Sequence, residues 1–198
     1  MSVPTALVKE LREKSGAGVI ECRDALAKYD CDIDKAMDFL RQKGREIAEK
    51  KKDRAVKEGI VEAYIHTGSK VGVLLELNCE TDFVARNEEF RNLARELTLQ
   101  IAAQAPKFIS RDTVPEDIKK EQEDLYRRMA LEENKPEHIV DKIVQGRMEK
   151  FYEENCLLDQ PYIRDEEKKI KDLVDEAVGK IRENIAIRRF ARFDVKEQ

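Results

Sequence analysis

The fold is decided at a junction near the middle of the chain, which reads Asn78-Cys79-Glu80-Thr81-Asp82-Phe83-Val84-Ala85-Arg86-Asn87. Residues 71–77 before it are aliphatic and rich in β-branched side chains, which predicts a strand. Residues 88–105 after it carry an apolar stripe at helical spacing, which predicts a helix. Because Thr81 and Asn87 are both favoured at helix N-caps, we expect a short helical segment before the longer helix begins.

Phe83, which follows Asp82 in this junction, has two interpretations. On an exposed junction a large apolar ring would be a contact residue for a partner, and the neighbouring acid could pair with a base or accept hydrogen bonds from a helix end. A single Phe after a strand is more often a core residue that packs the helix onto the sheet. The pattern alone favours the core interpretation.

The composition is typical of a helix-rich protein with a highly charged surface. The 198 residues are enough for one medium domain and a small one. Charged residues make up 40% of the chain, against about a quarter in ordinary domains. The net charge is −4, whereas a non-specific nucleic-acid binder would normally be strongly basic. We therefore expect no direct binding to nucleic acid.

The sequence predicts a soluble, cytoplasmic protein without a membrane segment. No apolar run approaches the length that crosses a bilayer, and the first residues begin no signal-peptide pattern. No C-x-x-C pair occurs, so reduced thiols are expected, and whether any of them links subunits is left open. The four cysteines are Cys22, Cys31, Cys79 and Cys156. His66 and His138 lie far apart, so no metal site is expected.

Residues 1–44 predict three short helices that form a small N-terminal domain. A break is expected at Ser15–Gly18, with Val19 and Ile20 in a loop or at the start of the next helix. Asp32 is a plausible cap for the third helix, which we expect to stop at Gly44. The layout resembles the ubiquitin-associated (UBA)-like domain. Residues 45–58 then predict a linker helix that is either simply solvated, which we favour, or weakly attracted to ribosomal RNA or an acidic partner.

Residues 59–198 predict an α+β core domain. Strands at 60–66 and 71–79 flank a Gly-containing loop, which indicates a hairpin, and residues 185–195 predict a third strand. We expect a small three-stranded antiparallel sheet with helices on one face and free edges.

The helices of this core include a protruding helical hairpin at about residues 114–155. A capping box that begins at Thr113 is predicted to open its first helix, and Asn134-Lys135-Pro136 is predicted to separate the two helices. Residues 156–162 predict a loop, after which Asp165 is expected to cap the last helix.

Motifs of enzyme chemistry are absent from the sequence. It contains no phosphate-binding P-loop, no dinucleotide-binding glycine pattern, no nucleophile elbow and no H-E-x-x-H. Cys79 with His66 is conceivable as a thiol–imidazole pair across the hairpin, but a thiol at the end of an apolar strand is ordinarily buried and inert. We therefore expect neither an enzyme nor a cofactor.

Several separated stretches, in the right order, resemble the translation elongation factor Ts family in its short form. Residues 7–18 and 22–26 resemble the N-terminal signature of the family, and residues 76–87 resemble its central signature, with Thr-Asp-Phe-Val-Ala-Arg-Asn at 81–87. Residues 146–151 resemble its C-terminal helix and residues 158–162 the loop after it. The resemblance covers nearly the whole chain.

The resemblance implies a nucleotide exchange factor that binds elongation factor Tu, both GDP-bound and nucleotide-free, and lowers its affinity for magnesium and nucleotide. It implies that Phe83 enters the GTP-binding domain of the partner, displacing the groups that hold Mg²⁺ and phosphate, while the core holds another domain of the partner. The implied contact residues are Thr81, Asp82, Phe83 and Val84 in the junction, and Arg12, Val19, Ile20 and Arg23 in the N-terminal domain.

This chain departs from the family in two ways. Val19-Ile20 stands where many members carry two Met, so apolar contact is kept but the adaptability of Met is lost. Longer members carry two related core subdomains, whereas this chain has one, and the resemblance to short members implies a homodimer. Two other classes of function stay open: a module that binds ubiquitin-like or nascent chains, and a thiol enzyme built on Cys79.

Overall fold

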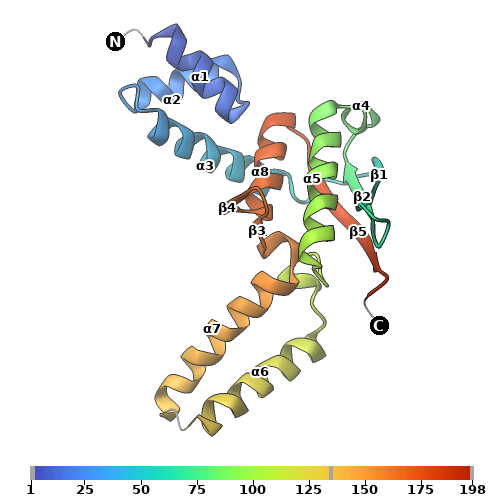
Figure 1. Ribbon diagram of the computed structural model, residues 1–198. Coiled ribbons are helices and arrows are strands. Elements are labelled where there is room, and N and C mark those ends of the chain that lie inside the picture. The colour runs from blue at the N-terminus through green and yellow to red at the C-terminus, as the bar shows by residue number, and fades with distance from the viewer. Residues whose placement is uncertain (1–2, 134–135, 197–198) are drawn as a thin grey trace. The chain divides into compact units, whose positions relative to one another are not determined.

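The computed structural model describes residues 3–133 and 136–196, which form an α+β protein with a small sheet of three antiparallel strands (Figure 1). The chain divides into two compact units, each built from segments that are distant in sequence. The first contains the residues up to Glu62, Glu76–Arg95 and Asp172–Arg188, and the second contains Ala63–Leu75, Glu96–Lys171 and the residues from Arg189 onward. The predicted fold class is confirmed.

Three helices begin the chain: α1 (Thr5–Ser15), α2 (Val19–Lys28) and α3 (Ile33–Lys51). Gly16 ends α1 in the left-handed conformation, with φ 66°, as the glycine-containing break predicted. The carboxylate of Asp32 accepts a hydrogen bond from the Lys35 backbone N–H at 3.0 Å, which confirms the predicted cap. The bundle closes on a core of Val8, Leu11, Cys22, Ala25, Leu26 and Ala36. Its likeness to the UBA-like domain stays a prediction.

Helix α3 does not stop at Gly44, so this prediction is wrong. The helix continues to Lys51, and Gly44 is buried within it. The reason is a close approach to helix α8 (Ile170–Ile181): a Cβ atom added to Gly179 would lie 3.0 Å from the Cα atom of Gly44. Gly44 therefore serves helix packing and not helix termination. The domain boundaries at residues 44 and 58 stay predictions.

The sheet has the strand order β1-β2-β5, with β1 (Glu58–Ile65), β2 (Val71–Cys79) and β5 (Ile185–Asp194). The predicted strand β2 forms, and its side chains alternate: Val73, Leu75 and Leu77 are buried, while Leu74 is exposed on the other face. The chain then forms the short helix α4 (Asp82–Ala85) and the long helix α5 (Glu88–Gln104), which confirms both predicted helices after the junction. Figure 1 shows α5 running along one face of the sheet.

Helices α6 (Glu116–Glu132) and α7 (Glu137–Asn155) form the predicted helical hairpin. Their shared core consists of Val114, Ala130, Val140, Val144, Met148, Phe151 and Cys156. The predicted break at Asn134-Lys135 lies outside the described residues. The predicted capping box is wrong, because Thr113 ends a 3-10 turn, η1 (Arg111–Thr113), in which its hydroxyl donates to the Ser110 carbonyl at 2.8 Å.

The segment after this hairpin differs from the prediction of a loop and an early helix. A 3-10 turn, η2 (Leu157–Asp159), leads into two short antiparallel strands, β3 (Pro161–Tyr162) and β4 (Asp165–Lys169), so Asp165 begins a strand and α8 starts only at Ile170. The buried side chain of Gln100 explains the difference. Its amide donates to the Gln160 side chain and the Pro161 carbonyl, and its oxygen accepts from the Ile163 N–H, at 3.0–3.2 Å.

Across residues 3–133 and 136–196, no helix combines the length and the apolar character that crossing a bilayer would require.

The approach of α3 and α8 gives a first test. A valine at Gly179 would press against the Gly44 backbone, so Gly179→Val should lower the free energy of unfolding by about 1 to 3 kcal/mol. Gly146, also in a helix, has open space around its Cα atom, and Gly146→Val should leave stability unchanged or slightly raised because Val is the better helix former. Thermal denaturation followed by circular dichroism compares the two variants, and equal midpoints would contradict the packing role of Gly44.

Candidate functional site

Phe83 is 84% exposed, so the core interpretation of this residue is wrong. It lies in α4, between β2 and α5. The next two residues of α4, Val84 and Ala85, are only 6% and 4% exposed. The turn therefore has a buried side that anchors it and an outer side that presents a bare aromatic ring to solvent. A large apolar ring in water is the feature of this turn that requires an explanation.

The residues on either side of Phe83 hold the turn in shape. Thr81 caps α4, because its hydroxyl oxygen accepts a hydrogen bond from the Val84 N–H at 3.4 Å. Asp82 forms an ion pair with Arg86 across one helical turn, with an N–O distance of 2.8 Å. Both charged side chains are exposed, so the pair adds little to stability but leaves a carboxylate and a guanidinium beside the ring.

The Phe83 turn, residues Thr81–Ala85, is fixed to the end of α8 by Glu183. The carboxylate of Glu183 accepts hydrogen bonds from the backbone N–H of Glu80 at 3.1 Å and of Thr81 at 3.0 Å, and from the Thr81 hydroxyl at 2.7 Å. Hydrogen bonds to an ionised group are stronger than neutral ones. No local sequence pattern predicts a role for Glu183, because its contact with Thr81 spans 102 residues.

Asn184 extends this contact to the segment between α3 and β1. Its backbone N–H donates to the Glu80 carboxylate at 2.7 Å, and its side-chain amide donates to the carbonyls of Lys52 and Arg54 at 3.1 and 2.8 Å. Asn184 is 7% exposed, so these bonds satisfy an amide that would otherwise be buried without partners. Asn184 likewise has no local sequence signal, because these side-chain contacts span 130 and 132 residues.

The other predicted contact residues lie on the N-terminal bundle. Val19 and Ile20 are the first two residues of α2 and are 54% and 66% exposed, so they form a second apolar surface. Arg12 on α1 and Arg23 on α2 are exposed, and Arg23 pairs with the neighbouring Asp24 at 2.7 Å. The exposed residues among those predicted thus form two groups, one on the Phe83 turn and one on the N-terminal bundle. Val84 belongs to the turn but is buried and anchors it.

Glu21 follows directly after Val19-Ile20 and connects α2 with two other elements. Its carboxylate accepts from Lys43 of α3 at 2.9 Å and from Arg182 after α8 at 2.5 Å. Partial burial acts to raise the pKa of Glu21, but the hydrogen bonds from Lys43 and Arg182 outweigh it and lower the pKa to about 2. Glu21 therefore stays ionised, and the contact is intact, throughout the physiological range of pH.

The site does not have the chemistry of a nucleophilic enzyme. Cys79 is fully buried, and burial, with a contribution from the nearby Glu183 carboxylate, raises the pKa of its thiol to about 11. His66 is engaged by the Tyr64 hydroxyl at 2.9 Å. Within the described part of the chain, no group of three or more His, Cys, Asp or Glu side chains could hold a metal ion.

The cysteines give a second test. At pH 8 iodoacetamide should modify the partly exposed Cys31 of the native protein and spare Cys79, because a buried thiol with a pKa of about 11 presents almost no thiolate. Cys156 is a matched control, since burial raises its pKa to about 11 as well. Peptide mapping by mass spectrometry reads out the modified residues, and rapid modification of Cys79 alone would restore the thiol-enzyme hypothesis.

Comparison with known proteins places this arrangement in a family. The model of the family described as Elongation factor TS matches residues 7–180. A protein named Elongation factor Ts from Caldanaerobacter subterraneus subsp. tengcongensis is 56% identical over 187 residues, which are 94% of each chain. Another of this name, from Pseudothermotoga lettingae, is 52% identical over 198 residues, the full length of both chains.

A third relative of the same name, from Thermodesulfovibrio yellowstonii, is 53% identical over 195 residues, 98% of this chain and 97% of its own. These likenesses run through the bundle, the Phe83 turn and the core alike, so they concern the whole chain and not one motif. On this evidence the chain belongs to the elongation factor Ts family.

Proposed function

We propose that this protein is a guanine nucleotide exchange factor in translation elongation, which binds elongation factor Tu in its GDP-bound and nucleotide-free states and promotes release of GDP. The observation that carries the proposal is the exposure of Phe83 on an anchored turn. Membership of the family supports the partner. The role belongs to the cytoplasm and requires neither a cofactor nor direct contact with nucleic acid or membrane.

In the proposed mechanism Phe83 enters the GTP-binding domain of the partner as a wedge. Thr81 and Asp82 lie beside it on the same exposed turn, so they meet the same surface of the partner. The insertion moves the groups that hold Mg²⁺ and the phosphates, and the nucleotide loses part of its contacts. A buried anchor supports this role, because a ring on a loose turn would lose ordering entropy each time it docked.

Exchange of this kind requires no covalent chemistry in the factor. The factor must bind the nucleotide-free partner more tightly than the GDP-bound partner, and the ratio of the two affinities is the factor by which GDP binding is weakened. A buried, protonated Cys79 and an exposed Phe83 agree with a binding role and not with catalysis.

The N-terminal bundle provides the second contact in this proposal. Val19 and Ile20 offer an exposed apolar pair, and Arg12 and Arg23 offer charges on the same bundle. We assign these residues to the same GTP-binding domain of the partner, and the core to another of its domains. The bundle then contributes affinity, whereas Phe83 contributes displacement of the nucleotide.

The proposal predicts a separation between docking and displacement. Phe83→Ala should lower the maximal rate of GDP release about tenfold or more, as loss of an aromatic anchor does in interfaces, while binding to nucleotide-free elongation factor Tu weakens less. Release of fluorescent GDP from purified elongation factor Tu, measured over a range of factor concentrations, gives the maximal rate, and calorimetry gives the affinity.

Leu131→Ala, which removes another exposed apolar side chain far along the chain, should match the wild type. If the wild-type protein does not accelerate release, the proposed function is wrong and a module that binds ubiquitin-like or nascent chains becomes the leading hypothesis. If wild type and Phe83→Ala are equally active, exchange stands but another residue displaces the nucleotide.

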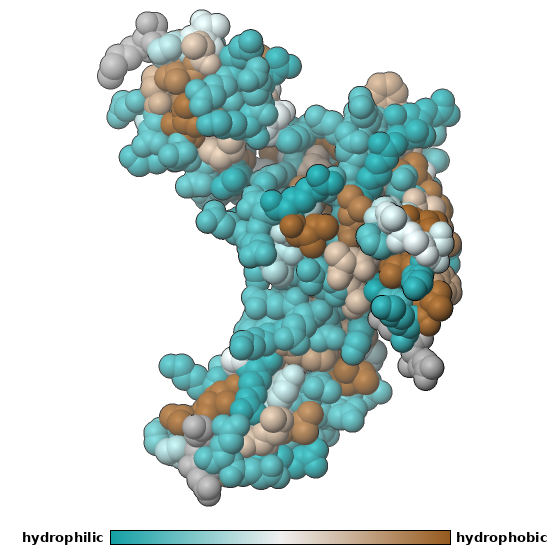
Figure 2. All heavy atoms as spheres, viewed as in Figure 1, coloured by the Kyte–Doolittle hydropathy of each residue, from teal (hydrophilic) through white to brown (hydrophobic). Residues whose placement is uncertain are grey.

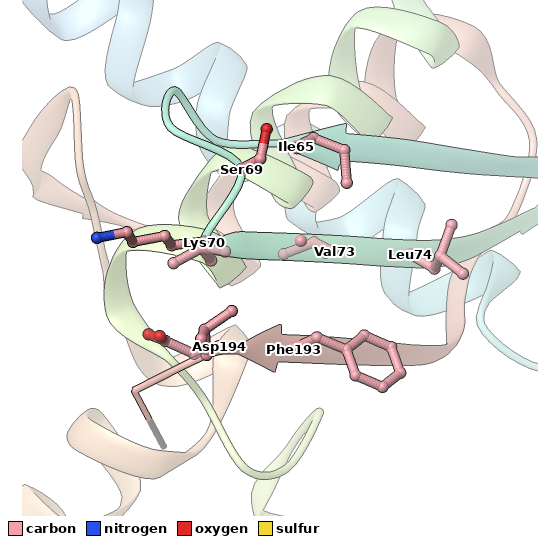
Figure 3. Close-up of a pocket in the computed structure, with 10 residues that line it drawn as sticks. Ile65, Ser69, Lys70, Val73, Leu74, Phe193 and Asp194 are labelled. Carbon is pink, nitrogen blue, oxygen red and sulfur yellow. The ribbon is translucent and has the colours of Figure 1, made fainter.

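We further propose that the protein acts as a homodimer. The sheet is small, and its outer strands β1 and β5 have free edges. Ile65, Leu74 and Phe193 come from the three neighbouring strands and line one hollow (Figure 3), and they are 64%, 48% and 67% exposed. Figure 2 shows hydrophobic atoms gathered over these strands. A second copy of this chain would cover these side chains and extend the core.

Sedimentation tests this proposal. The wild-type protein should sediment as a dimer at micromolar concentration, and Leu74→Glu should sediment as a monomer, because a charge would be buried in the apolar interface. Leu131→Glu introduces the same charge at an exposed leucine of α6 and should remain dimeric. A monomeric wild-type protein at this concentration would contradict the homodimer.

A further inference from the structure

The junction between α8 and β5, residues Arg182-Glu183-Asn184, contacts Thr81 in the Phe83 turn and Glu21, the residue that follows Val19-Ile20 in α2. Arg182 pairs with Glu21, next to Ile20 in α2. Glu183 accepts three hydrogen bonds from Glu80 and Thr81 at the start of the Phe83 turn. Residues of one short junction thus contact two segments, one next to Ile20 and one at Thr81, that are about sixty residues apart in sequence.

The backbone of the junction is held in an uncommon conformation. Arg182 has φ 66°, in the left-handed region that non-glycine residues rarely adopt, and its N–H closes the last turn of α8 on the Val178 carbonyl at 2.9 Å. A left-handed residue ends the helix and reverses the direction of the chain at once. Such a conformation persists only where the surrounding contacts determine it, and functional sites are where it concentrates.

Glu183 determines how the Phe83 turn leaves the sheet. Helix α4 has four residues, too few to be stable by itself, so its position depends on the groups that hold its first residues. The carboxylate of Glu183 binds the N–H groups of Glu80 and Thr81, and the Thr81 hydroxyl, immediately before the helix. Without the carboxylate these donors would turn to water and the ring would lose its fixed direction.

Arg182 acts on the other surface. The Glu21 carboxylate that receives it also receives Lys43, so the start of α2 is tied to α3 and to the end of α8 at one point. Asn184 holds the junction to the segment after α3, because its side-chain amide donates hydrogen bonds to the carbonyls of Lys52 and Arg54. The three side chains therefore serve one junction and are not unrelated surface contacts.

We propose that Arg182-Glu183-Asn184 is a positioning element that holds the Phe83 turn and the Val19-Ile20 surface in one preorganised arrangement, so that a single partner molecule meets both at once. The inference rests on the proposed function. Its physical basis is that two contacts on a rigid support act as one bivalent contact, whereas two contacts on independent supports each lose ordering entropy. The three residues touch no nucleotide and act only through the residues they hold.

The first test concerns Glu183. Glu183→Ala removes the acceptor and should lower the maximal rate of GDP release about tenfold, as loss of hydrogen bonds to a charged group implies, while the half-saturating concentration of the factor changes little. Glu183→Gln keeps an acceptor oxygen and a group that can bond the Thr81 hydroxyl, so it should restore most of the rate. Glu166→Ala removes an exposed carboxylate from β4 and should match the wild type.

Hydrogen exchange of the protein alone gives a second test of Glu183 that does not require the partner. Hydrogen exchange at the backbone N–H groups of Glu80 and Thr81 should be slow in the wild type and in Glu183→Gln, and fast in Glu183→Ala, with the thermal midpoint of the core unchanged. A variant that merely unfolded would lose protection throughout the chain. Equal protection of these two amides in all three proteins would overturn the proposal.

A double substitution separates positioning from other effects. If Glu183 acts through Phe83, adding Glu183→Ala to Phe83→Ala should not slow GDP release further, and an additive loss would overturn the proposal.

Arg182→Ala should instead raise the half-saturating concentration of the factor about threefold, as loss of one partly exposed ion pair implies, and Arg182→Lys should restore it. If Phe83→Ala impairs a functional wild type but neither Glu183→Ala nor Arg182→Ala has any effect, the proposed function stands and this inference fails.

Discussion

The carboxylate of Glu183 is the contact on which the geometry of the exposed turn depends. It gathers donors from two consecutive backbone amides and one hydroxyl, and the residue that supplies two of these donors, Thr81, also caps α4. The direction of Phe83 is thus set by a group more than one hundred residues away in sequence. The buried Val84 and Ala85 complete the support from the inner side.

An exchange factor has a particular need for such a support. In the proposed wedge mechanism it must present an apolar side chain to solvent, which folding ordinarily avoids, and it must keep that side chain from collapsing onto its own core. Here the short helix buries its second half and exposes its first half, and hydrogen bonds to the Glu183 carboxylate hold the two residues just before it. The position of Phe83 is thus ordered when the protein folds, so docking of this ring on a partner would cost little further conformational entropy.

Local patterns in the sequence were sufficient for most elements and insufficient for the site. The strand β2 and the cap at Asp32 depend on neighbouring residues, and the local pattern predicts both correctly. The pattern around Gly44 wrongly predicts a helix end, because a glycine that ends a helix and a glycine that lets a second helix approach look alike in sequence; only the structure places Gly179 beside it. The sequence around Phe83 is ambiguous because the exposure of this side chain depends on contacts with distant residues. Glu183 and Asn184 hold the turn, and no pattern near residue 83 reveals them.

The unbroken length of α3 determines how the N-terminal bundle is connected to the rest of its unit. Its 19 residues form a stiff rod about 28 Å long that begins in the N-terminal bundle and ends at Lys51, without the hinge that a break at Gly44 would have supplied. The carbonyls of Lys52 and Arg54, just beyond the end of this rod, accept hydrogen bonds from the Asn184 side-chain amide, so the rod is held at this end. The N-terminal bundle is thereby connected, through α3, to Asn184, the neighbour in sequence of Glu183, whose carboxylate holds the start of the Phe83 turn.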